Sequence, residues 1–429
     1  MSGSRTATGT SSRPTKTGPR FSRSDAPRPR RQRPVREARG VKLLAFSDVH
    51  LDSKFGWATR EVARRQRQRL RDGVTWTFEQ ARQEGAAAVL IGGDLFEHEL
   101  VSPDTVDFLR RTFERSGLQV LAAPGNHDYA DTESPYRRID WPDNVHIFRE
   151  THFTSKQLAD GVTIWGAAHR KPADTPGFFD DGFQVEGSGV HIAVFHGEER
   201  NAAFQAQYRH APFESDQIAA AGFDHAVVGH SHKPADRPTW TRLGSLERLK
   251  FNEEYGNAVV LEAENGEVKR RRLDPRPPAL HSLTVDLTEA ESADEARKRI
   301  GKALDGLAGA ARVRLIGEPD NLHLHAEDFG AASFEPPEGI DQVLVDTSGL
   351  TSPYDLEQIE DEPTVRGMFV RRVRDADLDR ETERIVLLAG LRALDDRDVG
   401  VLDDLRMAGI EADSSGEQLQ DVPTDGAAT

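Results

Sequence analysis

Seven residues of metal-ligating types follow five apolar runs and together form a set suited to two divalent cations. They are Asp48, His50, Asp94, Asn126, His196, His230 and His232. Imidazole nitrogens and carboxylate or amide oxygens suit manganese, iron or zinc, and the absence of cysteine removes thiolate sites. Two ions about 4 Å apart would clamp a phosphodiester and convert a bridging water into a hydroxide nucleophile. The expected cofactor is therefore a pair of divalent ions, with Mn²⁺ as the preferred identity.

Buried strands are expected to position these ligands. The apolar runs are Lys42 to Phe46, Ala86 to Ile91, Val120 to Ala123, His191 to Phe195 and Ala226 to Val228. Asp48 and His50 lie two residues apart, so extended backbone would point both side chains toward one ion, together with His232. The glycines at 92 and 93 permit a tight turn, after which the two oxygens of Asp94 can bridge both ions. The second ion would take Asn126, His196 and His230.

Each of these residues alone has an ordinary structural explanation. Asp and Gly favour solvated turns, and a histidine after an apolar run is more often a packed core residue. The chain, however, contains SDVH, GGDLF, GNHD, FHGE and GHSH in one order, and this recurrence favours a metal site.

The five blocks resemble the pattern of the calcineurin-like metallophosphoesterase superfamily over about residues 41 to 260. Three further stretches are similar to SbcD-type DNA repair nuclease subunits and their YhaO-like relatives: SDVHLDSKF (47–55), WPDNVHIF (141–148) and GSLERLKFNEEYGNAVV (244–260). The resemblance implies an α/β fold, a four-layer sandwich of two mixed β-sheets flanked by helices, with a smaller α+β C-terminal capping domain. It also implies a DNA exonuclease and endonuclease subunit of prokaryotic double-strand-break repair, with DNA and an SbcC-type coiled-coil ATPase as partners and a homodimer as its assembly.

Proton transfer to the leaving oxygen needs a further residue, and His127 is the candidate. It directly follows Asn126, so the backbone that fixes a ligand also positions the acid, and the resemblance implies this role for the histidine of GNHD. A cationic His127 needs an orienting carboxylate, which either Glu97 or Asp128 would provide. Glu97 is favoured because related phosphatases often carry an acid at that position. Some nuclease relatives carry histidine there, so this chain departs from their pattern.

Length and composition fit a multidomain enzyme without disulfides or a membrane anchor. The 429 residues allow two or three domains, and 37% apolar content is sufficient for a core. The chain has no cysteine, no apolar run near ~20 residues and no signal-peptide core at its N-terminus. A cytoplasmic location and no membrane partner are expected.

Charge is distributed unevenly. Residues 1–40 carry a formal charge of +9 and the remaining chain carries −25. The basic tail is expected to be disordered, and either to tether nucleic acid or to be a solubilising or mis-assigned extension. Ten lysines against 46 arginines, with acids throughout, suggest a salt-adapted, halophilic proteome. At ~1 M salt the Debye length is about 3 Å, so the acidic body does not exclude DNA.

The expected domains are a phosphoesterase domain at 41–275, a DNA-orienting capping domain at 276–350, a helical segment at 351–411 and a disordered acidic tail at 412–429. The boundary is the proline-rich stretch Leu273 to Ala279. Helices are expected at Glu61 to Gln83, from Ser102 to about Arg115, at Ala293 to Leu307 and at Glu381 to Leu394, with strands at Leu283 to Leu287 and Val313 to Ile316.

Two of these helical regions have two interpretations each. The helices within 61–115 either form a dimer, as the resemblance implies, or only pack on the sheet. The helix Glu381 to Leu394 either docks an ATPase or packs on its own domain. Two alternatives to the nuclease function also remain: a phosphatase or cyclic-nucleotide phosphodiesterase acting on small substrates, and an adaptor whose metal site is structural.

Overall fold

The structure is a computed structural model that describes residues 40–394, except 160, 201–209, 265, 289, 291, 318–333, 351–353 and 355. The basic tail of residues 1–39 and the acidic tail of residues 412–429 lie outside the described residues. So does the end of the expected helical segment, from residue 395 onward.

Two six-stranded mixed sheets make up the larger part of the molecule. The first has the order β12-β11-β1-β2-β3-β4, and the second has the order β5-β6-β7-β8-β10-β9. The strands of the first are β1 (Val41–Phe46), β2 (Ala88–Ile91), β3 (Gln119–Ala122), β4 (Val145–Ile147), β11 (Val259–Glu264) and β12 (Glu267–Arg272). Those of the second are β5 (Thr154–Ala159), β6 (Val162–Gly166), β7 (Val190–His196), β8 (His225–Gly229), β9 (Ala235–Asp236) and β10 (Trp240–Arg242).

The strands that lead to the ligands are parallel within each sheet. In the first sheet β1, β2, β3 and β4 pair in parallel, while β11 and β12 are antiparallel additions beside β1. In the second, β6, β7, β8 and β10 pair in parallel, and β5 and β9 are antiparallel edges. Since parallel strands end on the same side of a sheet, the loops that follow them are brought together.

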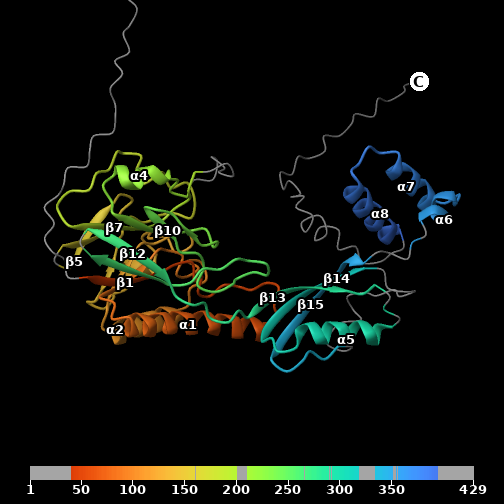
Figure 1. The fold of residues 1–429 in the computed structure, drawn as a ribbon, viewed down its shortest axis with the longest axis horizontal. Coiled ribbons are helices and arrows are strands. Elements are labelled where there is room, and N and C mark those ends of the chain that lie inside the picture. Colours follow the sequence, from red (N-terminus) through yellow and green to blue (C-terminus); the bar gives the residue numbers. More distant parts are fainter. Residues whose placement is uncertain are drawn as a thin grey trace, which may run out of the picture.

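Both faces of each central strand are buried, which explains the uninterrupted apolar runs in the sequence. In β1, Leu43 and Ala45 face the core between the two sheets, whereas Leu44 and Phe46 face the helices outside. The helices α1 (Arg60–Gln83) and α2 (Pro103–Ser116) cover that outer face. The short helix α4 (Ser215–Ala220) and a cluster of aromatic side chains cover the second sheet. The expected four-layer α/β sandwich is therefore confirmed (Figure 1).

Local capping determines where the two covering helices begin and end. The hydroxyl oxygens of Thr59 and Ser102 accept hydrogen bonds from first-turn backbone amides, and Pro103 occupies the first turn of α2. Gly117 ends α2 in a left-handed conformation, with φ of 67°. Both helices lie within two residues of their expected bounds. A further one-turn helix, α3 (Pro135–Arg138), follows in the chain.

A third sheet follows in the chain and consists of three parallel strands. They are β13 (Leu280–Asp286), β14 (Gly309–Gly317) and β15 (Ile340–Leu350), and α5 (Ala293–Leu304) connects the first two. Ala296, Ile300 and Leu304 pack from α5 into the core of this sheet. Figure 1 shows α1 running from the sandwich toward β13 and β15. There, Arg65 of α1 pairs with Asp341.

The last described helices are α6 (Leu356–Asp361), α7 (Val365–Arg374) and α8 (Arg380–Leu394). They pack on one another through a small core that contains Ile359, Val370, Leu387 and Leu391. Leu387 and Leu391 of α8 are thus already buried, which favours packing within this group for that part of the apolar face. None of the described helices is both long enough and apolar enough to cross a lipid bilayer.

Candidate metal centre

All seven expected ligands converge beyond the carboxyl ends of β1, β2, β3, β7 and β8. Hydrogen bonds link the loops of the two sheets at this edge. Asp48 N donates to Gly93 O at 3.0 Å, and His230 N donates to Asp48 Oδ1 at 3.0 Å. The Nδ1–H of His196 donates to Gly92 O at 3.0 Å. The ligands therefore lie on loops that are fixed by the backbone of both sheets.

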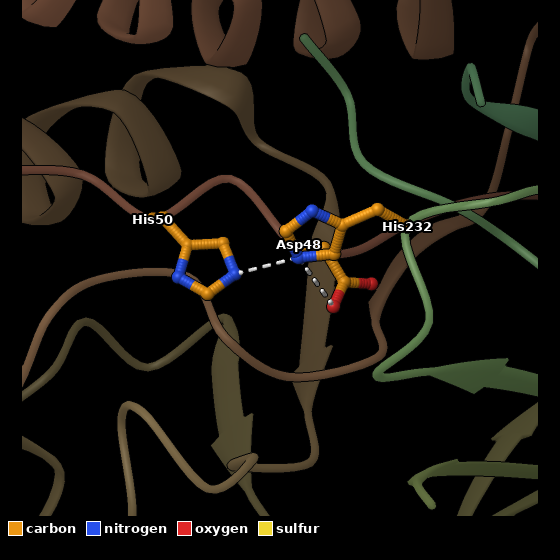
Figure 2. Close-up of side chains that lie close together, drawn as sticks. All are labelled: Asp48, His50 and His232. Atoms are coloured by element: carbon orange, nitrogen blue, oxygen red, sulfur yellow. Dashed lines mark hydrogen bonds and ion pairs between the residues drawn. The ribbon is translucent and has the colours of Figure 1, made fainter. Parts of the chain in front are cut away.

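Asp48, His50 and His232 form the first group of donors. The Nε2 atoms of the two histidines are 3.1 Å apart, and His232 Nε2 lies 3.9 Å from Asp48 Oδ1. Figure 2 shows the three side chains pointing toward one another. Asp48 and His50 come from the loop after β1 and His232 from the loop after β8, so the two sheets contribute jointly.

Asn126, His196 and His230 form the second group. Asn126 Oδ1 lies 3.0 Å from His196 Nε2 and 3.1 Å from His230 Nδ1, and these two nitrogens are 3.2 Å apart. These three side chains thus lie together, and their assignment to a second ion stays a prediction.

Asp94 lies between the groups, but it uses one oxygen rather than two. Its Oδ2 is 3.2 Å from His196 Nε2 and 3.7 Å from His50 Nε2. Its Oδ1 accepts a hydrogen bond from the backbone N–H of His127 at 2.8 Å. The backbone of the neighbouring loop thus occupies Oδ1, and Oδ2 is the oxygen that faces both groups.

The donors fit a pair of divalent ions. Two nitrogens bound at about 2.1 Å and at right angles around one ion lie about 3 Å apart. The imidazole pairs at 3.1 Å and 3.2 Å have this spacing. In each pair two ring nitrogens point at one position. A metal cation there can accept the lone pairs of both nitrogens, whereas a single proton bonds to only one of them. Borderline metals such as manganese, iron and zinc accept this mixture of imidazole, carboxylate and amide donors.

Three of the four ligand histidines donate their Nδ1–H to an acceptor on the far side of the ring, which fixes the tautomer. His50 Nδ1–H donates to Glu97 Oε1 at 2.8 Å, and His232 Nδ1–H donates to Glu253 Oε1 at 2.6 Å. His196 uses the carbonyl of Gly92. Each arrangement leaves Nε2 with a free lone pair toward the donor group. The sequence did not single out Glu253 as this acceptor. The requirement that a ligand histidine have such an acceptor was a signal, but the chain offers many carboxylates.

Burial and attraction act in opposite directions on the central carboxylate. Burial raises the pKa of Asp94, but the nearby imidazole of His196 outweighs this and holds the pKa well below its usual range. The same contact raises the pKa of His196 to about 9 despite its burial. Asp94 is therefore ionised and attracts positive charge, which a divalent cation supplies in place of a proton.

Left-handed backbone shapes the ligand loops. Asp48, His50, Asp94 and His230 have φ of 53°, 52°, 52° and 98°. Non-glycine residues adopt positive φ rarely, and strained backbone of this kind clusters at active sites and ligand-binding loops. The expected extended backbone at Asp48 and His50 is therefore wrong. Val49 N and His50 N both donate to Asp94 O, and this curls the chain directly after β1.

Glycine gives the loops their close approach. A Cβ on Gly93 would lie 2.6 Å from His196 Nδ1, and one on Gly125 would collide with Asp94 and with the ring of His196. Gly93 also has φ of 94°. The tight turn expected at this position is present. It requires glycine, because any side chain there would displace the ligands.

Glu97 joins His127 to the first donor group. The Nδ1–H of His127 donates to Glu97 Oε2 at 2.9 Å, while the other oxygen accepts from His50. These hydrogen bonds outweigh burial and lower the pKa of Glu97 to about 2. The hydrogen bond that His127 donates to Glu97 in turn raises the pKa of His127, whose side chain is 47% exposed. His127 is thus oriented and accessible, and one of its ring nitrogens lies within 4.8 Å of ligand atoms of His50 and Asp94.

Asp128 has a different environment from the one expected of an orienting carboxylate. It is fully buried and accepts hydrogen bonds from the backbone N–H groups of Asp94, Leu95 and Gly125 and from the hydroxyl of Tyr136. Its carboxylate therefore braces the two ligand loops instead of holding the His127 ring. Its position directly after His127 made Asp128 a candidate for the orienting carboxylate. In the fold, however, its side chain points into the protein interior and away from the His127 ring.

Replacement of Asp128 by alanine is expected to lower stability first. Four donors would lose their acceptor in a buried place, at about 1–3 kcal/mol each, and neighbouring effects would overlap. We expect the free energy of unfolding to fall by at least ~3 kcal/mol in urea titrations. Asp107→Ala, which removes a half-exposed carboxylate from α2, serves as the control. A stable Asp128→Ala protein that has lost only turnover would contradict the bracing role.

Comparisons with known proteins bear on the same region. Residues 41–234 match the family model "Calcineurin-like phosphoesterase". The chain is 26% identical over 280 residues to the "Uncharacterized metallophosphoesterase YhaO" of Bacillus subtilis (strain 168), a match over 59% of this chain and 64% of that protein. The match to the family model thus spans all seven expected ligands.

Two solved structures are also similar over about half of the chain. The structure of TT1561 of Thermus thermophilus has a TM-score of 0.34 and 13% identity, covering 54% of this chain and 98% of that one. A dimetal phosphatase from Danio rerio has a TM-score of 0.31 and 9% identity, covering 55% and 99%.

Proposed function

We propose, from the calcineurin-like phosphoesterase match of residues 41–234 and the geometry of the donors, that the chain is a metal-dependent phosphoester hydrolase. One observation carries the proposal: the Oδ2 atom of Asp94 lies between two groups of buried donors. A purely structural site has no need for the oriented and accessible His127 beside them, which disfavours the adaptor hypothesis.

The seven donor residues would hold two divalent ions. Asp48, His50, Asp94 and His232 would hold one divalent ion, and Asp94, Asn126, His196 and His230 would hold the other. Two such ions supply charge stabilisation for phosphoryl oxygens and lower the pKa of a nearby water.

His127 supplies a proton to the oxygen that leaves. Its Nδ1–H is held by Glu97, so Nε2 is the atom free to face a substrate. Glu97 keeps the ring in one orientation and stabilises its cationic form. Since Glu97 also accepts from His50, the acid and the first donor group are held in a fixed relation.

We further propose that the physiological substrate is DNA and that the chain is an exonuclease and endonuclease subunit working as a homodimer with an SbcC-type ATPase. The segment 244–260 and the third sheet support this branch. A small substrate does not require a second domain such as the third sheet. Arg248 of the segment 244–260 donates to Leu280 O of β13 at 2.8 Å, so this segment connects the third sheet to the sandwich close to the metal centre.

A phosphatase or phosphodiesterase for small substrates is the second candidate. Glu97 favours it, because an acid at this position is more typical of the phosphatases, whereas some nucleases carry histidine there. The two candidates differ in the length of substrate that must reach His127.

Linear duplex DNA and a small chromogenic phosphodiester, each with Mn²⁺, would separate the candidates. We expect the purified chain to degrade end-labelled DNA and to lose this activity with a chelator. The Asp94→Ala protein, prepared identically, controls for a contaminating nuclease. Hydrolysis of the small ester alone would overturn the DNA assignment and favour the second candidate. Inactivity on both substrates with two bound ions would contradict the hydrolase proposal itself.

A further inference from the structure

Glu253 connects a metal-ligating histidine to a loop outside the ligand motifs. Its Oε1 accepts the Nδ1–H of His232 at 2.6 Å. Its Oε2 accepts the backbone N–H groups of Leu249 and Lys250 at 2.7 Å and 3.2 Å. Only 14% of the Glu253 side chain is exposed. One carboxylate therefore fixes the ring of His232 and the fold of the loop 249–253 together.

The same loop is attached to the third sheet. Asn252 has φ of 62°, and its backbone N–H donates to Ser282 Oγ in β13 at 3.0 Å. Phe251 is 9% exposed and packs with Leu280 of β13, Ala310 of β14 and Val62 of α1. The guanidinium of Arg312 in β14 lies 5.0 Å from the centre of the Phe251 ring. Both strands thus hold the loop in place.

This attachment distinguishes His232 from two other ligand histidines. His196 relies on the carbonyl of Gly92, and His50 relies on Glu97, and both acceptors belong to loops of the sandwich. The acceptor of His232 belongs to a loop that packs on the sandwich through Leu249 but also contacts β13 and β14. A displacement of the third sheet would therefore move Glu253 first and the other acceptors little.

We propose that Glu253 is a positioning residue for His232, and that the loop 249–253 transmits the docking of the third sheet to the first donor group. The proposal rests on the metal centre of the proposed function. Loss of the carboxylate frees the ring to rotate and to change tautomer, so Nε2 is no longer held toward the ion. The consequence is confined to the group of Asp48, His50 and His232, because Asn126, His196 and His230 have no contact with this loop among the described hydrogen bonds.

Titration calorimetry with Mn²⁺ tests the positioning role without any substrate. In Glu253→Gln we expect the affinity of one of the two binding steps to fall about 10–100-fold, the usual effect of losing an outer partner, and the other step to stay within about twofold. Glu253→Asp, which keeps the charge on a shorter chain, should lose less. Glu254→Gln is the matched control, because this neighbouring carboxylate pairs only with Lys233 in the described contacts and is 62% exposed.

The variant Phe251→Ala tests transmission from the third sheet. In the described contacts the Phe251 side chain touches none of the seven donors. Its removal loosens the loop 249–253, so we expect the same binding step to weaken. Val285→Ala removes a buried side chain from the core of the same sheet, away from the loop, and should leave both steps unchanged. Circular dichroism establishes that each variant is folded before titration.

The outcomes separate this inference from the proposed function. Equal weakening of both steps in Glu253→Gln, or none, would overturn the positioning role. Unchanged binding in Phe251→Ala would overturn the transmission. Selective loss of one step in Glu253→Gln, together with a wild-type chain that hydrolyses no phosphoester, would support the inference and contradict the hydrolase.

Discussion

Replacing Asp94 with alanine is expected to remove ordered binding of both divalent ions and to lower turnover by at least ~1000-fold. The Oδ2 atom faces both donor groups, so its loss removes one ligand from each group and also a negative charge that both groups face. A loss of about 4 kcal/mol of transition-state stabilisation corresponds to that factor. Metal content by elemental analysis after dialysis, together with turnover on a phosphodiester, provides the measurement.

The control for this variant is Asp104→Ala, which removes an exposed carboxylate at the start of α2. It should retain two ions and full turnover. Asp94→Asn preserves the shape of the side chain and its hydrogen bond to the His127 backbone, so it distinguishes lost charge from a displaced loop. Two ions per chain in Asp94→Ala would contradict the shared-ligand assignment.

Replacing His127 with alanine is expected to lower turnover by ~100-fold or more while both ions are retained. General acid catalysis contributes on this scale, and the ring is not part of either four-residue donor set. Its backbone N–H still donates to Asp94 in the variant, so the ligand geometry should survive. Turnover at saturating Mn²⁺ and metal content in the same preparation separate the two effects.

His152→Ala provides the control, because it removes an exposed histidine outside the site. A substrate with a better leaving group should recover part of the rate of His127→Ala, since it needs less protonation. Near-normal turnover on an ordinary phosphodiester would remove His127 from the mechanism. A parallel loss of metal would instead show that the ring supports the ligands.

The strands that carry the ligands were predictable because burial on both faces produces a simple sequence pattern. Leu43 and Leu44 face different cores, so a doubly buried strand appears as an uninterrupted apolar run. The polar residue that follows such a run lies at the edge of the sheet, and Asp48 and Asp94 were recognised in this way. The left-handed backbone at both residues could not be recognised, because it results from hydrogen bonds between two loops.

Residues whose role depends on distant contacts were less predictable. Asp128 and Glu97 are both acids near His127 in the sequence, and only the fold shows that one faces backbone amides and the other faces two imidazoles. Glu253 is 21 positions from His232 and lies in a polar stretch without periodicity. Its contact forms only once the loop closes against β13.

Two strands whose residues are mostly exposed or only partly buried were also missed. The edge strand β12 has the sequence EVKRRR, and its alternate residues are at most partly buried. The strand β15 has the sequence IDQVLVDTSGL, in which most residues are partly exposed. Both strands form because a neighbouring strand offers backbone partners, β11 and β14 respectively, so their pairing is a property of the assembled sheet.

Anomalous scattering from crystals soaked with Mn²⁺ would test the central claim most directly. The account predicts two peaks per chain about 4 Å apart, with the carboxylate of Asp94 between them. One peak should contact Asp48, His50 and His232, and the other should contact Asn126, His196 and His230. A single peak, or two peaks that do not share Asp94, would contradict the account.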